Sequence, residues 1–284
     1  MASIASLLQR ALELDSASAR LDTELLLAQV LGQPRSYLYT WPGKQVTAAQ
    51  LAQFETLFAR RKQGEPVAYL LGQQGFWSLD LQVSNATLIP RADTEILVST
   101  VLEMFAGEQQ LQVLDLGTGT GAIALALSCE RPGWQLTGVD REAAAVQLAR
   151  LNGNNCGLEQ VEFLQSDWFA AVAGRKFDLI VSNPPYIALD DPHLEQGDVR
   201  FEPLSALVSG ADGLDDIRHI IANAGTYLRE QGWLLLEHGH QQGQAVRDLL
   251  RHAGFVQVRT QSDLAGNERV SLGQWYHRQE ALAC

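Results

Sequence analysis

The chain is poor in cysteine: Cys129, Cys156 and Cys284 are the only three in 284 residues. No two of them have Cys-x-x-Cys spacing, so the sequence predicts neither a zinc framework nor a set of disulfides. The run Glu237-His238-Gly239-His240 has no partner cluster elsewhere in the sequence, and we interpret its histidines as strand-end residues rather than metal ligands. We therefore expect no metal site and a reducing, cytoplasmic environment.

Long apolar runs and positive charge are also scarce. No apolar stretch approaches the roughly 20 residues of a membrane span, and the first ten residues lack a signal peptide's basic start and apolar core. Lys and Arg number 21 against 33 Asp and Glu, a formal net charge of −12. Because a protein that follows a phosphate backbone normally carries a basic face, we expect no membrane partner and no direct nucleic-acid partner. Arg60-Arg61-Lys62 is interpreted as a solvated helix end, where cations complement the helix macrodipole.

The chain is long enough for one substantial domain and a smaller one. Apolar residues at helical spacing over Ile4–Leu14, Ala19–Leu31 and Thr47–Gln63 predict a helical domain from residue 1 to residue 72. Two short strand-like segments predict a β-hairpin within a linker over 73–92. From 93 to 284, strands alternate with helices, which predicts an α/β fold whose mostly parallel sheet binds ligands at the carboxyl ends of its strands.

A glycine-rich loop follows the first strand of that region. The apolar run Leu111–Leu116 is typical of a buried strand, and Ala122–Leu127 is typical of a helix. Between them lie Gly117, Thr118, Gly119, Thr120 and Gly121, whose glycines let the backbone approach a ligand closely. The next strand ends at Asp140, where an acid usually binds the hydroxyls of a ribose. A nicotinamide dinucleotide and S-adenosylmethionine both fit this pattern.

Two further strand ends favour the methyl donor. Asp167 and Trp168 follow a third strand, Val161–Ser166, where an acid could bind an adenine amino group and an aromatic ring could cover the base. A fourth strand, Phe177–Ser182, leads into Asn183-Pro184-Pro185-Tyr186. The Asn183 oxygen and the Pro184 carbonyl can accept hydrogen bonds from a planar amino group, and Tyr186 offers a stacking face. A dehydrogenase has no need of this arrangement.

These residues carry a family resemblance. Asp115-Leu-Gly-Thr-Gly-Thr-Gly121 together with the tetrapeptide resembles S-adenosylmethionine-dependent amino methyltransferases. Three other segments narrow the resemblance to the HemK-type glutamine N5-methyltransferases of peptide chain release factors. They are Leu88-Ile-Pro-Arg91-Ala-Asp93-Thr-Glu95, Arg200-Phe-Glu202-Pro203-Leu-Ser-Ala-Leu207 and Gly213-Leu214. Ala92 departs from the family, which usually has proline there, and Val208-Ser209-Gly210 departs where a glycine pair is common.

The resemblance implies a Rossmann-like class I methyltransferase sheet of seven strands, with a small N-terminal helical domain joined by a β-hairpin. It implies methyl transfer from S-adenosyl-L-methionine, leaving S-adenosyl-L-homocysteine, to the glutamine of a Gly-Gly-Gln motif in release factors. We expect a monomer. The candidate catalytic residues are Asn183, Pro184 and Tyr186, and the candidate substrate-binding residues are Asn183, Pro184, Pro185 and Tyr186. The candidate cofactor-binding residues are Gly117, Thr118, Gly119, Thr120, Gly121, Asp140, Asp167, Trp168 and Asn183.

Two other functions remain as alternatives. An adenine N6-methyltransferase acting on nucleic acid could use the same tetrapeptide on a flipped base, but the acidic charge argues against it. A non-catalytic protein that only binds the cofactor is disfavoured by the intact Asn183. We also expect the polar loop over 190–210 to exclude water and the helical domain to recognise the substrate. Arg91 and Glu95 are expected either to clamp a ligand or loop, or to form an ion pair at a helix start.

Overall fold

The computed structural model describes residues 2–107 and 110–276. These residues form two compact units. The first, here the helical unit, groups the residues up to Gln73 with the segment Pro192–Phe201, and the second, the sheet unit, contains Gln74–Asp191 and the residues from Glu202 onward.

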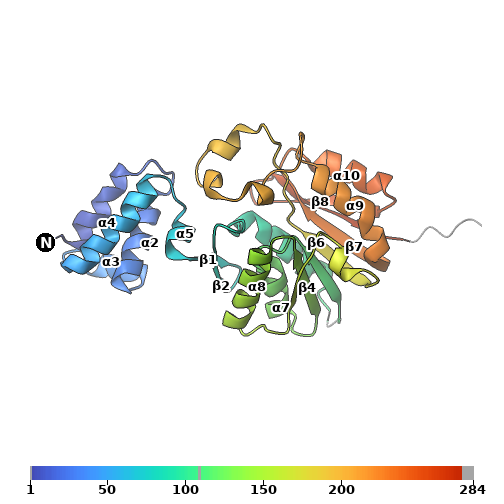
Figure 1. Ribbon diagram of the computed structural model, residues 1–284, viewed down its shortest axis with the longest axis horizontal. Coiled ribbons are helices and arrows are strands. Elements are labelled where there is room, and N and C mark those ends of the chain that lie inside the picture. Colours follow the sequence, from blue (N-terminus) through green and yellow to red (C-terminus); the bar gives the residue numbers. More distant parts are fainter. Residues whose placement is uncertain (1, 108–109, 277–284) are drawn as a thin grey trace, which may run out of the picture. The chain divides into compact units, whose positions relative to one another are not determined.

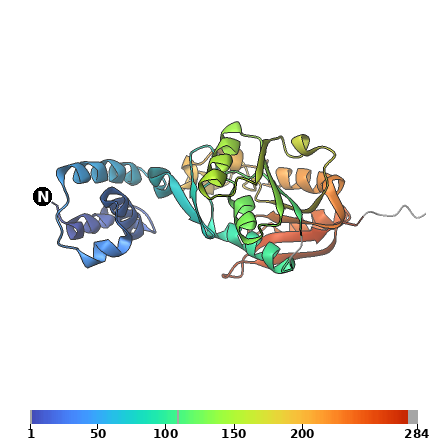
Figure 2. The ribbon, with the colours of Figure 1, turned by 90° about the horizontal axis from the view of Figure 1, so that it is seen from below.

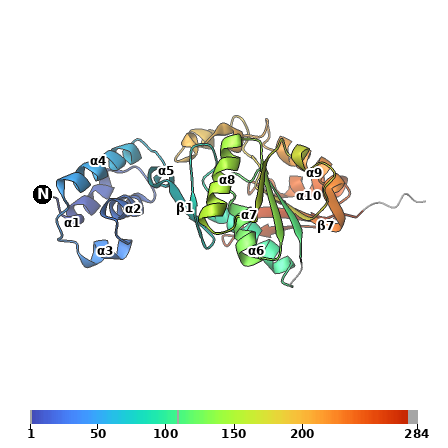
Figure 3. The same cartoon turned by 60° about the horizontal axis from the view of Figure 1, so that its bottom comes forward.

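The helical unit is built on a small apolar core that includes Leu26, Phe54 and Phe58. Thr47 starts its longest helix with a capping box, since its hydroxyl accepts from the backbone of Gln50 and the Gln50 side chain accepts in return. The segment expected to be helical over Ile4–Leu14 is helical, but it is divided into a short α-helix and a 3-10 helix at Gln9–Glu13. The α-helices of this unit (Figure 3) are α1 Ile4–Leu8, α2 Ala19–Leu31, α3 Arg35–Thr40, α4 Ala48–Lys62 and α5 Val67–Leu71.

A buried arginine ties the segment Pro192–Phe201 to these helices. Arg61 is 8% exposed and pairs with Asp22 at 2.8 Å and with Asp198 at 2.7 Å. Arg200 adds a hydrogen bond to the carbonyl of Gln63 at 2.9 Å. The interpretation of Arg60-Arg61-Lys62 as a solvated helix end is therefore wrong for Arg61, whose buried charge is compensated by two carboxylates.

The sheet unit begins with the hairpin of β1 (Gln73–Phe76) and β2 (Leu79–Gln82). Its main sheet has seven strands in the order β5-β4-β3-β6-β7-β9-β8, and Figure 2 shows the ribbon from below. β9 runs antiparallel to β7 and to β8, whereas the other neighbouring pairs are parallel. The seven-stranded, mostly parallel sheet is as expected from the sequence. Its strands are β3 Gln112–Leu116, β4 Gln135–Asp140, β5 Glu162–Gln165, β6 Phe177–Ser182, β7 Leu228–Glu237, β8 Val256–Ser262 and β9 Glu268–Gln274.

Helices cover both faces of this sheet (Figure 1). Successive side chains of a strand point to opposite faces, so Leu179 and Val181 join one apolar cluster while Ile180 joins the other. The helices on the first face are α6 Glu95–Met104, α7 Ala122–Glu130 and α8 Ala143–Asn155; those on the second are α9 Asp215–Tyr227 and α10 Gly243–His252. Within the described ranges, no helix has the length and apolar character that a bilayer crossing requires.

Candidate active site

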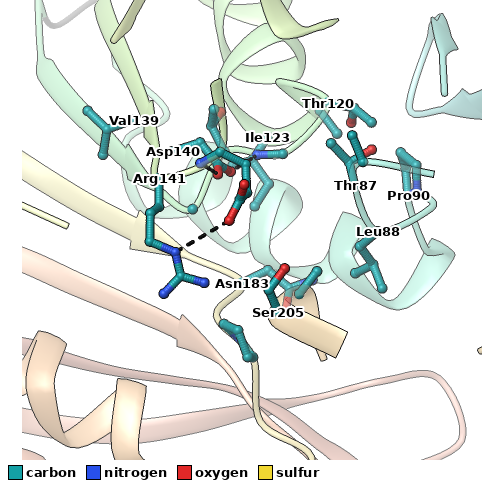
Figure 4. A pocket seen from close by; sticks show the side chains of 18 of the residues that line it. Thr87, Leu88, Pro90, Thr120, Ile123, Val139, Asp140, Arg141, Asn183 and Ser205 are labelled. Carbon is teal, nitrogen blue, oxygen red and sulfur yellow. Dashed lines mark hydrogen bonds and ion pairs between the residues drawn. The ribbon is translucent and has the colours of Figure 1, made fainter. Parts of the chain in front are cut away.

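Four strand ends meet at one edge of the sheet. Because β5, β4, β3 and β6 are neighbours and parallel, the residues that follow their carboxyl ends lie side by side. A cavity of about 200 Å³ opens at this edge. Figure 4 shows Asp140 and Arg141 on one side of the cavity, Thr87, Leu88 and Pro90 on the opposite side, and Asn183 and Ser205 below. All these lining residues belong to the sheet unit.

The glycine loop has a backbone conformation that favours glycine. Gly117, Gly119 and Gly121 have φ angles of 69°, 56° and 84°, in the left-handed region where a side chain is strained. Beneath the loop, Asp115 is fully buried and accepts a hydrogen bond from the Thr118 hydroxyl at 2.6 Å. Burial raises the pKa of Asp115 to about 7, although the hydrogen bond from Thr118 acts in the opposite direction.

Asp140 supports the same loop from the end of β4. Its Oδ2 accepts from the backbone N–H of Gly119 at 2.9 Å, and its Oδ1 accepts from that of Glu142 at 2.9 Å. Burial raises the pKa of Asp140, and these two backbone hydrogen bonds lower it. The carboxylate is thus fixed in the cavity wall, with free lone pairs left on both oxygens.

Trp168 follows the third strand end in a strained conformation. Its φ is 46°, and its ring lies near Gly117, where an added Cβ would be 3.8 Å from Cζ3. Such outliers persist only where the surrounding structure fixes them, and they cluster at ligand sites. Trp168 and the exposed Asp167 both line the cavity.

The tetrapeptide divides between the cavity and the core. Asn183 and Pro185 line the cavity, and Pro184 is buried. Nδ2 of Asn183 donates to Oγ1 of Thr94 at 3.0 Å. The carboxamide is therefore held by its nitrogen, which turns its oxygen away from Thr94.

Tyr186 packs against the apolar cluster on the second face of the sheet. Its hydroxyl points to Oε1 of Glu237 at 3.4 Å, at the end of β7. Glu237 is 1% exposed, and burial raises its pKa to about 7. Burial also raises the pKa of Tyr186, with the carboxylate of Glu237 acting in the same direction.

Several lining residues were not among the candidates. The segment before α6 supplies Thr87, Leu88, Pro90, Arg91 and Thr94, and the segment before α9 supplies Ser205, Ala206 and Val208. The runs Leu88–Glu95 and Arg200–Leu207 carried the family resemblance, and this was the signal that could have identified them.

Of the two alternatives for Arg91 and Glu95, the ion pair with each other is not formed. Arg91 pairs with Glu202, which is 5% exposed, while Glu95 accepts from the backbone N–H of Trp77 at 2.8 Å. The two acids therefore anchor different segments: Glu202 fixes the loop over 89–91, and Glu95 fixes the β1–β2 hairpin.

The segment over 190–210 is not a simple polar loop. It contains three 3-10 helices, at Pro192–Glu195, Val199–Phe201 and Leu204–Ala206. The first two belong to the helical unit, and the third lies beside the cavity. After the third 3-10 helix, Val208 forms a parallel β-bridge with Ile187, the residue that follows the tetrapeptide.

Of the two histidines in the run, His238 is structural and His240 is exposed. The ring of His238 is fully buried, its Nε2 lies 2.8 Å from Oγ of Ser271, and burial lowers its pKa. Over residues 2–107 and 110–276, no group of three or more His, Cys, Asp or Glu side chains is arranged to bind a metal. Cys129 and Cys156 carry free thiols, and Cys284 lies outside the described residues.

Two family models match this chain. The PrmC N-terminal domain matches residues 4–72, and the methyltransferase small domain matches residues 91–196. The release factor glutamine methyltransferase of Pseudomonas aeruginosa is 59% identical over 275 residues, covering 97% of this chain and 99% of that relative. The protein of the same name from Escherichia coli is 52% identical, covering 92% of this chain and 94% of that relative.

Solved structures are similar in fold. A methyltransferase from Pyrococcus furiosus superimposes with a TM-score of 0.53 at 18% identity, covering 78% of this chain and 98% of the other. At this identity the similarity establishes the fold alone, which is a class I methyltransferase architecture.

Proposed function

This chain belongs to the release factor glutamine methyltransferase family, and from that premise we propose that it methylates the side-chain amide nitrogen (N5) of a glutamine in peptide chain release factors. As a member of this family, it is a protein-glutamine methyltransferase. The observation that carries the proposal at the site is the carboxamide of Asn183, which lines the cavity and is held there by its nitrogen. The family implies a Gly-Gly-Gln motif as the target.

The cavity suits an adenosine-bearing methyl donor, and we propose S-adenosylmethionine. The glycine loop from Gly117 to Gly121 lets the backbone approach the donor closely, and Asp140 lies where a ribose hydroxyl pair is usually bound. Asp167 and Trp168 would bind and cover the adenine. When bound, S-adenosylmethionine supplies an electrophilic methyl group on a positively charged sulfur.

The residues of the tetrapeptide would orient the acceptor. A carboxamide nitrogen is a poor nucleophile because its lone pair is delocalised into the carbonyl. Oδ1 of Asn183 and the carbonyl of Pro184 would each accept a hydrogen bond from one N–H of the glutamine, which fixes the nitrogen in place. The same acceptors favour the positive charge that develops there as the nitrogen–carbon bond forms, and the proton then leaves to water.

The position of Tyr186 limits its part in this scheme. Its hydroxyl donates to Glu237, so we do not assign it to proton transfer. We propose instead that Tyr186 packs beneath the pocket and beside the substrate. Ser205, Ala206 and Val208 also line the cavity and would exclude water.

We further propose that different parts of the chain have different roles. Residues 1–72 would recognise the release factor, 73–92 would link the two parts and also supply Thr87, Leu88 and Pro90 to the cavity wall, and 93–284 would provide the other donor-binding residues and carry out transfer. Support comes from the match of the PrmC N-terminal domain to residues 4–72 and from the placement of the cavity entirely in the sheet unit.

The test supplies the purified chain with labelled S-adenosylmethionine and separate pools of release factor, DNA and RNA. We expect label on the release factor alone. Asn183→Ala should lower kcat by roughly 10²–10³, as for loss of one preorganised polar contact, and should leave S-adenosylhomocysteine affinity almost unchanged. Asn154→Ala, at an exposed position on α8, is the matched control. Label on DNA or RNA would establish the adenine methyltransferase alternative, and normal turnover of Asn183→Ala would refute the role of this carboxamide.

A further inference from the structure

A buried asparagine on α8 is hydrogen-bonded to the glycine loop and has no part in the chemistry described so far. Asn152 is fully buried. Its Oδ1 accepts from the backbone N–H of Gln82 at 2.7 Å, and its Nδ2 donates to the carbonyls of Gln82 at 3.0 Å and Thr120 at 2.9 Å. One side chain therefore joins the end of β2 to the glycine loop, although 70 and 32 residues separate it from these partners in the chain.

The three partners require a side chain with two donors and one acceptor. A carbonyl oxygen can only accept and a backbone N–H can only donate, so Nδ2 must face the two carbonyls and Oδ1 must face the N–H. A carboxyl in the same place has at most one O–H and, when it is ionised, none. Loss of the carboxamide would leave buried backbone groups of Gln82 and Thr120 without these partners, which is unfavourable.

The two segments that Asn152 joins form the same part of the cavity wall. Thr120 lines the cavity, and the chain that leaves β2 soon reaches Thr87, which lines it too. The segments lie close together, since a Cβ added to Gly119 would be 3.9 Å from Cβ of Thr87. Figure 4 shows Thr87 and Thr120 on the side of the cavity opposite Asp140. Asn152 therefore holds the backbone on both sides of this end of the cavity.

The place of this end decides which portion of the donor it meets. In the proposed function, Asp140 binds the ribose, and Asp167 and Trp168 bind the adenine. The adenosine portion thus occupies the ends of β4 and β5. The amino-acid portion is attached to the ribose through the sulfur, and the space for it lies on the opposite side, between the glycine loop and Thr87.

We propose that Asn152 is a positioning residue that preorganises this end of the cavity for the amino-acid portion of the methyl donor. The proposal rests on the proposed function, since it presumes that the donor is S-adenosylmethionine. Glycine loses more conformational freedom on ordering than any other residue, so an unsupported glycine loop would oppose binding. A loop that is already held at Thr120 leaves less of that loss to the donor. Asn152 acts through the backbone of its two partners and not by contact with the donor.

The experiment compares binding of S-adenosylhomocysteine with binding of methylthioadenosine, which has the same adenosine and sulfur but lacks the amino-acid portion. Isothermal titration calorimetry is applied to the parent chain, to Asn152→Asp, which keeps the size of the side chain, and to Asn152→Ser, which keeps a single hydroxyl. We expect the Kd for S-adenosylhomocysteine to rise about 10-fold in both variants, as for loss of one or two buried hydrogen bonds. The Kd for methylthioadenosine should be unchanged.

Turnover provides a second comparison. With release factor as the acceptor, the KM for S-adenosylmethionine should rise in both variants, whereas the KM for the release factor should not. Asn154→Asp introduces the same substitution at an exposed position on the same helix. This matched control should bind both ligands as the parent does.

The outcomes separate the positioning role from the proposed function and from a general effect on folding. A parent chain that binds neither ligand refutes the proposed donor before any variant is compared. If the parent binds both, an unchanged Kd for S-adenosylhomocysteine in both variants refutes the positioning role. An equal loss of affinity for the two ligands also refutes it, because it indicates a general loosening of the fold. If Asn152→Asp shows no cooperative thermal transition, Asn152→Ser decides the question by the same comparison.

Discussion

At the scale of the residue, Asp140 has an unusual set of partners for a ligand-binding acid. Both of its oxygens already accept from backbone N–H groups, those of Gly119 and Glu142. The side chain therefore shapes the glycine loop as well as offering lone pairs to a ribose. An asparagine has the same size, but its NH₂ would have to face one of the two N–H donors.

We predict that Asp140→Asn weakens S-adenosylhomocysteine binding by about 1.5–3 kcal/mol, the range for a hydrogen bond that involves a charged group. The loss combines a missing acceptor for the ribose with a donor-to-donor contact at Gly119 or Glu142. Isothermal titration calorimetry measures it. Asp248→Asn on α10, which removes a carboxylate away from the cavity, serves as control. Parent-like affinity in Asp140→Asn would show that this carboxylate does not hold the donor.

At the scale of the element, the turn before α9 is in close contact with the backbone of the tetrapeptide. Gly213 has a φ of 75°, and a Cβ there would lie 2.2 Å from the carbonyl oxygen of Tyr186. That oxygen accepts from Nε2 of Gln242 at 3.0 Å, so Gly213 and Gln242 both contact the backbone at Tyr186. A small movement of this turn would be transmitted directly to Asn183.

Gly213→Ala and Gly157→Ala form a matched pair that isolates this contact. Gly157 also has a positive φ, 69°, but a Cβ there meets nothing within 4 Å. Gly157→Ala should cost about 1–2 kcal/mol of unfolding free energy for the left-handed conformation alone. Gly213→Ala should cost about 1–3 kcal/mol more for overpacking and should lower kcat about 10²-fold through displacement of the tetrapeptide. Thermal unfolding and turnover assays measure the two effects, and equal kcat in the two variants would argue against the contact.

The elements themselves were largely readable from the sequence, and the reason is local. The runs before Gly117, Asp140, Asp167 and Asn183 are apolar and end in glycine or polar residues, so each strand end could be placed without tertiary information. Boundaries that depend on packing were less accurate. The segment expected to be helical over Ile4–Leu14 changes from an α-helix to a 3-10 helix after Leu8, which its apolar spacing does not indicate.

The residues that the sequence did not reveal are those defined by long-range pairing. Thr94 contacts Asn183 although 89 residues separate them in the chain, and Glu237 meets Tyr186 because β6 and β7 are neighbours in register. Arg61 stands in a run of three cations that is typical of an exposed helix end, and only the fold shows its two carboxylate partners. No local pattern distinguishes these positions from ordinary surface or core residues.

At the scale of the whole molecule, the chain joins the two units three times. It passes between them after Gln73, after Asp191 and after Phe201. The last two connections flank Pro192–Phe201, which lies in the sequence between Tyr186 and the cavity-lining residues Ser205, Ala206 and Val208. Pro192–Phe201 belongs to the helical unit, and the chain on each side of it continues into residues of the proposed glutamine pocket. A substrate bound to the helical unit would therefore influence the pocket through this segment.

Asp198→Asn tests this connection. The substitution removes one of the two acids on Arg61 and loosens Pro192–Phe201 from the helices. Because Asp198 is 38% exposed, we expect a cost of about 1 kcal/mol, seen as an increase of about fivefold in KM for the intact release factor. A short Gly-Gly-Gln peptide needs only the pocket, so its weak methylation should be unchanged. Asp190→Asn, an exposed neighbour in the sheet unit, should leave KM for both substrates unchanged. Equal slowing of peptide and intact factor would place the effect of the segment in the transfer step, and no change in either would show that the helical unit recognises its substrate independently of Pro192–Phe201.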